Sequence, residues 1–327
     1  MTGSDRQVAQ SKTNPTSGTP RVCPVMPGSP LTPPAPIAVV GLGALGLPMA
    51  ANLRAAGYPL RVHTRSRLAE QDPSLAGAIP SGTPAEAVDG CTALLLCVSD
   101  DAAVEAVLWG PQGAGPALAP GSLVIDCSTI SPAQAQAMAT RLGARGVDYI
   151  DTPVTGGTEG AKAGTLTVLC GGEVEDLERA RPLLEVIGGS IHHFGPVGAG
   201  QQVKAINQVL VAGSYAAVAE AMALGEHLRL PMEQVVHALK NGAAGSWALE
   251  HRSAAMLSDA YPLGFKLALH HKDLGIALEA ATAAGVELPI TAAVRDQEQA
   301  LMDQGLGDAD VSALRRALPK PANHTKP

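Results

Sequence analysis

The sequence predicts an α/β protein with two domains. The N-terminal domain is expected to contain a doubly wound parallel sheet, and the C-terminal domain to be all-helical, beginning with a long interdomain helix. Short apolar runs alternate with helical patterns over residues 36–197, which is typical of a parallel sheet covered by helices on both faces. After about residue 200 the strand patterns stop. A chain of 327 residues, 46% of them hydrophobic, is long enough for two cores.

Seven apolar runs in the N-terminal part are predicted as strands, because each is short and separated from the next by turn or helical residues. They cover residues 37–40, 60–64, 93–98, 123–127, 149–151, 165–169 and 191–194. Three segments between them have helical apolar spacing, and these cover residues 47–56, 100–108 and 131–142. We expect all seven strands to belong to one sheet.

The C-terminal part is predicted to contain helices only. Its first helix is expected over residues 201–230, with an apolar stripe of Val203, Ile206, Leu210, Val211 and Ala217. Four further helices are expected over residues 232–241, 246–257, 265–284 and 291–304. The predicted domain limits are therefore 36–197 and 198–317, with a frayed tail over 318–327.

Residues 1–35 are rich in Pro, Ser, Thr and Gly and show no sustained periodicity. Such a segment buries too little apolar surface to offset its ordering entropy, so we expect a disordered leader. It has no apolar run typical of a secretory signal. A translation start at Met26 is an alternative explanation for the segment.

Composition limits the classes of partner. The net charge of −7 argues against nucleic acid, because phosphate binding needs a concentrated basic surface. No unbroken run of 18 apolar residues is present, so no membrane span is expected. The cysteines are odd in number and form no CxxC pair, which favours free thiols and a cytoplasmic protein. They are Cys23, Cys91, Cys97, Cys127 and Cys170.

The first predicted strand runs directly into a cluster with the spacing Gly-x-Gly-x-x-Gly, and a helix begins behind it. Three glycines alone would indicate only a turn, since the chain has 36 glycines. The strand and helix around them favour a dinucleotide-binding loop of Rossmann type, with the pyrophosphate at the helix N-terminus. The candidate cofactor-binding residues are Gly41, Leu42, Gly43, Ala44, Leu45 and Gly46.

The end of the second predicted strand indicates which cofactor is used. NAD-binding proteins normally carry an acid about 20 residues past the glycine loop, but no Asp or Glu occurs between Gly46 and Glu70. Three other polar residues occupy that place, namely Thr64, Arg65 and Ser66. A guanidinium matches a 2′-phosphate, so we expect NADPH, with NADH possible. The alternative is that Arg65 only faces solvent.

Other candidate residues lie at predicted strand ends, where ligands of open α/β sheets bind. Ser128 and Thr129 follow the fourth strand, and Cys97 and Val98 end the third. We assign Ser128 to the substrate and the other three to the cofactor. Further along the chain, consecutive backbone N–H groups of Thr155, Gly156 and Gly157 could hold a substrate carboxylate. A turn before a hairpin is the alternative for that segment.

Lys204 lies early in the long helix, with Asn207 and Gln208 three and four residues further on the same face. Its neighbours Val203 and Ile206 are apolar, which would lower the pKa of the lysine and suit proton transfer. A solvated lysine without function is the alternative for an isolated helix residue.

Taken in order, these stretches resemble the β-hydroxyacid dehydrogenase family. "GLGALGLPMA" is similar to the family's cofactor loop, with Leu45 where Met is more usual. "DCSTISP" and "DTPVTGG" resemble its substrate-binding segments, with Thr155 where Ser is common. "GAGQQVKAINQ" resembles its catalytic motif, and "FKLALHHKDLGIAL" its KDL segment, which contributes Lys272 and Asp273. The resemblance covers roughly residues 36–315.

The resemblance implies an NADPH-dependent reductase of small semialdehydes or 2-oxo acids that bear a carboxylate. Lys204 would donate the proton, Asn207 or Gln208 would orient substrate and lysine, and Lys272 would close over the cofactor. It also implies a homodimer or homotetramer formed through the helical domain. An imine reductase and a non-catalytic dinucleotide-binding protein are the alternatives. No metal is expected, because the adjacent pairs His192–His193 and His270–His271 point to different faces.

Overall fold

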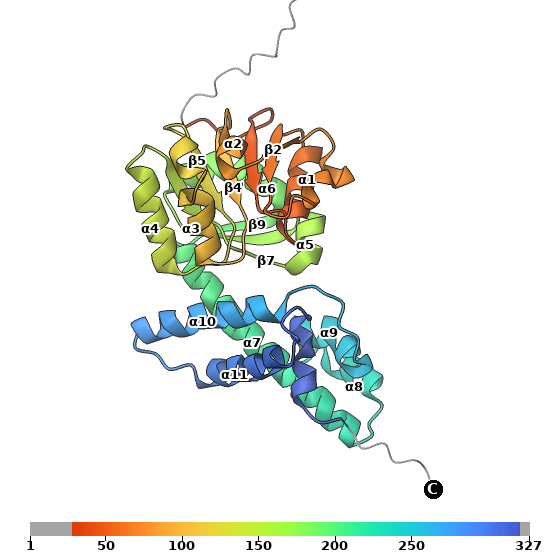
Figure 1. Cartoon of the computed structure of the whole chain (residues 1–327). Helices are drawn as coiled ribbons and strands as arrows, with labels where there is room; N and C mark the ends of the chain where they lie inside the picture. The colour runs from red at the N-terminus through yellow and green to blue at the C-terminus, as the bar shows by residue number, and fades with distance from the viewer. Residues whose placement is uncertain (1–27, 321–327) are drawn as a thin grey trace, which may run out of the picture.

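The computed structural model describes residues 28–320 and has two domains joined by one long helix (Figure 1). The N-terminal domain contains a six-stranded parallel sheet with the order β3-β2-β1-β4-β5-β6, which confirms the doubly wound fold. Its strands are β1 (Ile37–Val40), β2 (Leu60–His63), β3 (Ile79–Pro80), β4 (Ala93–Leu96), β5 (Leu123–Asp126) and β6 (Asp148–Asp151).

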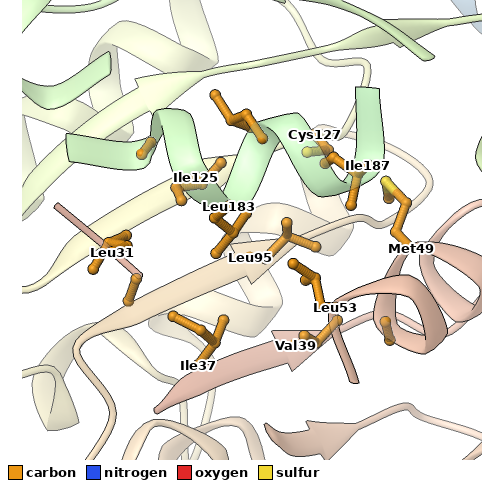
Figure 2. Close-up of a cluster of buried hydrophobic side chains, with 14 of the residues drawn as sticks. Leu31, Ile37, Val39, Met49, Leu53, Leu95, Ile125, Cys127, Leu183 and Ile187 are labelled. Atoms are coloured by element: carbon orange, nitrogen blue, oxygen red, sulfur yellow. The ribbon is translucent and has the colours of Figure 1, made fainter. Parts of the chain in front are cut away.

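Helices cover both faces of this sheet because its strands alternate two sets of buried apolar side chains. Figure 2 shows one face, where Ile37 and Val39 of β1 pack with Met49 and Leu53. On the other face Val40 packs with a second apolar cluster. The helices of this domain are α1 (Gly46–Ala55), α2 (Pro84–Val88), α3 (Asp101–Trp109), α4 (Pro132–Gly143), α5 (Gly157–Ala163) and α6 (Val174–Ile187).

The expectation of a single sheet is wrong. A second, three-stranded sheet has the order β7-β8-β9, with strands β7 (Val154–Thr155), β8 (Leu166–Cys170) and β9 (Gly188–His193). The antiparallel partner of β8 is β7, and only an isolated bridge between Asp151 and Gly171 links this part to β6. Pattern alone predicted strands near residues 165–169 and 191–194, but strand pairing depends on how the chain turns after β6.

The helical domain is built around α7 (Ala199–His227), against which the other helices pack. They are α8 (Met232–Leu239), α9 (Trp247–Ser258), α10 (Leu267–Ala283) and α11 (Pro289–Asp303), followed by the 3₁₀ helix η4 (Val311–Ala317). By length and composition α7 is apolar enough to cross a membrane. In this fold 44% of its most apolar 18-residue window is buried, and a single such helix is weak evidence for a membrane span.

The predicted apolar stripe of the long helix faces the wrong way. Ile206 is 62% exposed and Leu210 is 69% exposed. The buried face carries Lys204, Gln208 and Tyr215. The prediction failed because α7 is apolar on both sides: Ala212, Val218 and Met222 are buried in the core, while Ile206 and Leu210 lie on the opposite face.

Two predictions for the chain ends also need correction. Residues 1–27 and 321–327 lie outside the described part, but residues 28–35 have a defined conformation in which Leu31 and Ala35 are buried. Leu31 is completely buried, and the Tyr58 hydroxyl donates a hydrogen bond to its carbonyl at 2.8 Å. The prediction of a frayed tail from residue 318 is wrong at its start, because Lys320 forms an ion pair with Asp259 at 2.8 Å.

Candidate active site

The glycine loop connects β1 to α1 at the carboxyl edge of the sheet. Gly41 has a φ of +95°, and a Cβ atom on it would lie 2.1 Å from the Cys97 carbonyl oxygen. A Cβ atom on Gly46 would lie 1.9 Å from the Gly41 carbonyl oxygen. Only glycine fits at these two positions. Gly43 differs, because nothing lies within 4 Å of the place of its Cβ. The loop is therefore tightly packed underneath and open above Gly43, which fits the pyrophosphate of a dinucleotide.

At the end of β2, Arg65 and Ser66 are exposed, and Thr64 is half-buried. Within residues 28–320 the Arg65 guanidinium forms no ion pair. Glu70, which sequence reasoning left without a role, is buried and accepts a hydrogen bond from the Thr64 backbone N–H at 2.9 Å. Arg67 pairs with the same carboxylate at 2.8 Å. The first acid after the glycine loop thus holds the strand end in place and is neutralised by Arg67.

Ser128 is buried at the end of β5, and its hydroxyl accepts a hydrogen bond from the Val98 backbone N–H at 3.0 Å. Cys97 and Val98 continue β4 and are half-buried at this edge. The Ser128 hydroxyl therefore joins the ends of β4 and β5. Its backbone N–H donates in turn to Asp126 at 2.9 Å.

Asp126 and Asp151 are register partners at the ends of β5 and β6, and both are completely buried. Asp126 also accepts a hydrogen bond from the Tyr149 hydroxyl at 2.9 Å. Asp151 accepts from the backbone N–H groups of Gly198 at 2.7 Å and Gln201 at 2.9 Å, so it fixes the start of α7. Burial raises the pKa of each carboxyl to about 6.

Gln201 connects the same helix start to the segment from Ser128 to Ile130. Its amide donates to the Ser128 carbonyl at 2.8 Å and accepts from the Ile130 N–H at 3.2 Å. Sequence reasoning missed Asp126, Asp151 and Gln201. The available signal was that each acid ends an apolar strand, where a carboxylate needs a specific partner.

Lys204 is buried between the two domains, and its ammonium donates a hydrogen bond to the Val154 carbonyl at 2.9 Å. Burial lowers the pKa of this lysine, and the nearby Asp273 carboxylate partly opposes the effect. The direction agrees with the sequence prediction, but the assigned cause was wrong. Ile206 is largely exposed and Val203 half-buried, so domain packing around Lys204 buries the ammonium.

Lys204, Asn207 and Gln208 share one face of α7, as predicted from their spacing. The Asn207 amide donates to the Gln208 side-chain carbonyl at 2.7 Å, and Gln208 donates to Asp273 of α10 at 2.7 Å. Asp273, which had received no role, is thus the acceptor at the end of this chain of hydrogen bonds. It is 3% exposed.

Lys272 reaches from α10 to the sheet edge. Its ammonium donates to the Thr129 carbonyl and pairs with Asp273 at 2.7 Å. The helical domain therefore contacts the residues that follow β5 through a lysine. Thr129 itself is half-buried, and this contact uses its backbone.

The segment after β7 is exposed and conformationally unusual. Gly156 has a φ of +127° and Gly157 a φ of +64°, so both occupy backbone conformations that favour glycine. Thr155 precedes them and is half-buried. The residues assigned to the substrate carboxylate therefore lie directly after Val154, whose carbonyl holds Lys204.

The described residues contain no group of three or more His, Cys, Asp or Glu side chains placed to hold a metal ion. Four cysteines fall in the same part of the chain, and all are free. They are Cys91, Cys97, Cys127 and Cys170.

Two family models match the chain consecutively. Residues 36–195 match the NAD-binding domain of 6-phosphogluconate dehydrogenase. Residues 198–318 match the NAD-binding domain of NADP-dependent 3-hydroxyisobutyrate dehydrogenase.

Individual proteins agree with these matches. The 2-hydroxy-3-oxopropionate reductase of Escherichia coli is 38% identical over 285 residues, which cover 87% of this chain and 97% of that protein. The NAD-dependent L-serine dehydrogenase of Pseudomonas aeruginosa is 38% identical over 287 residues, which cover 86% and 96%. The structure of Mycobacterium tuberculosis 3-hydroxyisobutyrate dehydrogenase with L-serine superimposes with a TM-score of 0.77 at 31% identity, covering 86% and 98%.

One conclusion follows from three observations. They are a glycine loop of dinucleotide type on a parallel sheet, a helical domain that contacts the carboxyl edge of that sheet, and similarity along nearly the whole length of these relatives. The chain belongs to the β-hydroxyacid dehydrogenase family, NAD(P)-dependent oxidoreductases that act on hydroxyl and oxo groups.

Proposed function

We propose that this protein is an NADPH-dependent reductase of small semialdehydes or 2-oxo acids that bear a carboxylate, with Lys204 as the proton donor. The observation that supports this most is the buried ammonium of Lys204, held by the Val154 carbonyl beside the substrate segments. A lysine buried between two domains has a lowered pKa, which suits it to proton transfer.

The glycine loop from Gly41 to Gly46 would hold the cofactor, which would supply the hydride when bound. Lys204 donates its proton to the substrate's carbonyl oxygen as negative charge develops there, which stabilises that oxygen in the transition state. Ser128, Thr155, Gly156 and Gly157 hold the substrate carboxylate. Asn207 donates to Gln208 and Gln208 to Asp273, and we assign these two amides to orienting the substrate and the lysine.

The preference for NADPH rests on the end of β2. Arg65 is exposed and free of carboxylate partners within residues 28–320, so its guanidinium is available to a 2′-phosphate. Thr64 and Ser66 flank it. Glu70, the first acid after the glycine loop, is already paired with Arg67.

A reduction screen tests the proposal. Purified protein is mixed with NADPH, and separately with NADH, together with glyoxylate, succinic semialdehyde, tartronate semialdehyde or methylmalonate semialdehyde. We expect one or more of these to be reduced with kcat/KM well above that of a cyclic imine control, and faster with NADPH. Turnover of the imine alone would contradict the proposed substrate class, and a strong preference for NADH would contradict the cofactor assignment.

We further propose that two copies associate through the exposed apolar face of α7. Ile206, Leu210, Leu224 and Leu228 are each about 60% exposed or more and recur with helical spacing. In a homodimer the α7 faces of two copies would pack together and remove these side chains from water. A homotetramer would contain two such pairs. Four free cysteines in the described chain support a reducing, cytoplasmic location.

A further inference from the structure

Arg252 of α9 is a buried cation near the segment from Thr155 to Gly157. Its side chain is 10% exposed. One terminal nitrogen donates to Glu159 at 3.1 Å, and another donates to the His251 carbonyl at 3.3 Å. The Nε atom is buried and has no hydrogen-bond partner within residues 28–320. A guanidinium carries five N–H donors, so this one retains unused hydrogen-bonding capacity.

The nearest buried acid does not use that capacity. The Asp310 carboxylate lies 3.7 Å from the Arg252 Nε, which is beyond hydrogen-bond distance. Its own oxygens accept backbone N–H bonds from Gly264, Phe265 and Ser312. Asp310 therefore neutralises part of the charge of Arg252 while its acceptor positions are taken.

Aromatic packing fixes the guanidinium in place. The Trp247 ring lies under it, with 4.6 Å between the Arg252 Cζ and the ring centroid. Such stacking holds the plane of the guanidinium, so the terminal nitrogen that meets Glu159 keeps its direction. Trp247 is 48% exposed, so this stack lies where the helical domain meets solvent.

Glu159 is the partner that an incoming ligand could displace. Its side chain is 57% exposed, and it lies two residues after Gly157 in α5. An ion pair with one exposed partner contributes little, because water competes for the carboxylate. The Arg252 guanidinium is thus covered, on the side of the substrate segment, by a weakly held carboxylate.

We propose that Arg252 binds a second carboxylate of the substrate, which replaces Glu159, so that the preferred substrates are hydroxy or oxo acids with two carboxylates. The first carboxylate is held by the segment from Thr155 to Gly157, and the second by Arg252. This inference rests on the proposed function, because it adds a second anchor to the same site. A substrate carboxylate shielded from water would pair with this buried arginine more strongly than the exposed Glu159 carboxylate does.

Two hydroxy acids that differ in one side chain, which carries a second carboxylate in one of them, provide the test. 3-Hydroxyisobutyrate carries a methyl group where 2-(hydroxymethyl)glutarate carries a carboxyethyl group, and the reacting alcohol is the same. Oxidation of both is measured with NADP⁺ for the wild type, Arg252→Met, Arg252→Lys and Glu159→Gln. Arg316→Met is the matched control, since this arginine also stacks on an aromatic ring and pairs with a carboxylate, but through Tyr261 and Asp259 of the helical domain alone.

For the wild type we expect kcat/KM to be at least tenfold higher with the dicarboxylate. Arg252→Met should lower the ratio of the two kcat/KM values by about 100-fold, and Arg252→Lys by about tenfold, because lysine keeps the charge without the fork. Glu159→Gln should raise the ratio several-fold by removing the competing carboxylate. Arg316→Met should not change it. Equal losses on both substrates in Arg252→Met and Arg252→Lys would overturn the proposal.

Binding measured without turnover separates this inference from the proposed function. Glutarate and butyrate differ by one carboxylate, and calorimetric titration gives their affinities for the protein–NADP⁺ complex. We expect glutarate to bind at least tenfold more tightly, and this difference to disappear in Arg252→Met and to persist in Arg316→Met. Equal binding of the two acids by the wild type would overturn the second anchor, even if the screen finds a monocarboxylate substrate. Glutarate binding without turnover of any acid would support the anchor and contradict the proposed function.

Discussion

The ammonium of Lys204 combines three features that a proton donor needs: burial, a fixed backbone acceptor and a nearby carboxylate. Val154 orients it, and Asp273 lies close enough to keep its charged form accessible despite burial. Val154 and Asp273 belong to different domains, so the position of the Lys204 ammonium depends on the packing of both domains. Removal of the amine should therefore affect chemistry more than cofactor binding.

We expect Lys204→Ala to lower kcat by at least about 1,000-fold, at the upper end of what general acid catalysis contributes. The glycine loop is formed by β1 and α1, so the affinity for NADPH should change by less than about threefold, within the scatter expected for a site that the substitution does not touch. Steady-state kinetics and fluorescence titration of NADPH check the two halves. Ordinary turnover by the variant would show that another group donates the proton.

Arg65 carries the second prediction at the residue scale. Its guanidinium is exposed at the end of β2, and a 2′-phosphate would be its only strong partner there. Arg65→Ala should raise KM for NADPH about tenfold, the loss of one exposed charge-assisted contact, and leave KM for NADH almost unchanged. Parallel titration with both cofactors is the internal control. An equal change in both KM values would mean that Arg65 contacts the shared part of the cofactor.

At the scale of elements, the ends of β5 and β6 and the start of α7 form one unit. Asp126 holds the Ser128 segment, and Asp151 fixes the first turn of α7 through Gly198 and Gln201. Lys204 follows Gln201 by three residues, so this anchor determines where the lysine enters the site. The arrangement buries two carboxyl groups next to each other.

The pH dependence of stability should reveal these buried carboxyls. The pKa of Asp126 is raised from 3.8 to about 6, so the native state binds a proton more tightly than the unfolded state between those values. Stability from this group is therefore present below about pH 4 and is lost as pH rises through about 6. Asp126→Asn keeps an acceptor for Ser128 and removes the charge, so the variant should be less pH-sensitive.

Urea denaturation at pH 5 and pH 7.5 measures this effect. The difference in unfolding free energy, Asp126→Asn minus wild type, is measured at each pH. It should be more favourable to the variant at pH 7.5 than at pH 5, by on the order of 1–2 kcal/mol. Cofactor and substrate are left out so that binding does not contribute. A difference between the two proteins that is the same at both pH values would show that Asp126 is ionised throughout.

At the scale of the whole molecule, α7 has two different faces, to which we assign different roles. One face holds Lys204 and Gln208 in the site, while the other exposes Ile206, Leu210, Leu224 and Leu228. Leu210→Glu combined with Leu224→Glu places charges on the second face without altering the first. We expect sedimentation velocity to show a homodimer or homotetramer for the wild type and a monomer for the variant. A monomeric wild type would contradict the proposed assembly.

Much of the fold could be predicted from the sequence, because local patterns carry it. Alternation of strands and helices predicted the main sheet, and the spacing of Gly41, Gly43 and Gly46 predicted the loop whose packing the structure explains. The helices of the C-terminal domain followed from their periodicity. The second sheet did not, because β7 is two residues long and pairs with β8 only after the chain has passed through α5.

The candidate site was only partly predictable for the same physical reason. Motifs placed Lys204, Ser128 and Lys272 on particular elements, since strand ends and helix spacing are local properties. The sequence by itself determined the fold class, the cofactor loop and the polar residues available to it. Only the tertiary structure decided that domain packing buries Lys204, that Asp273 accepts from Gln208, and that Arg252 meets Glu159 across 93 positions of the chain. Burial and charge pairing between distant segments depend on how the two domains close on each other, and no local pattern records that.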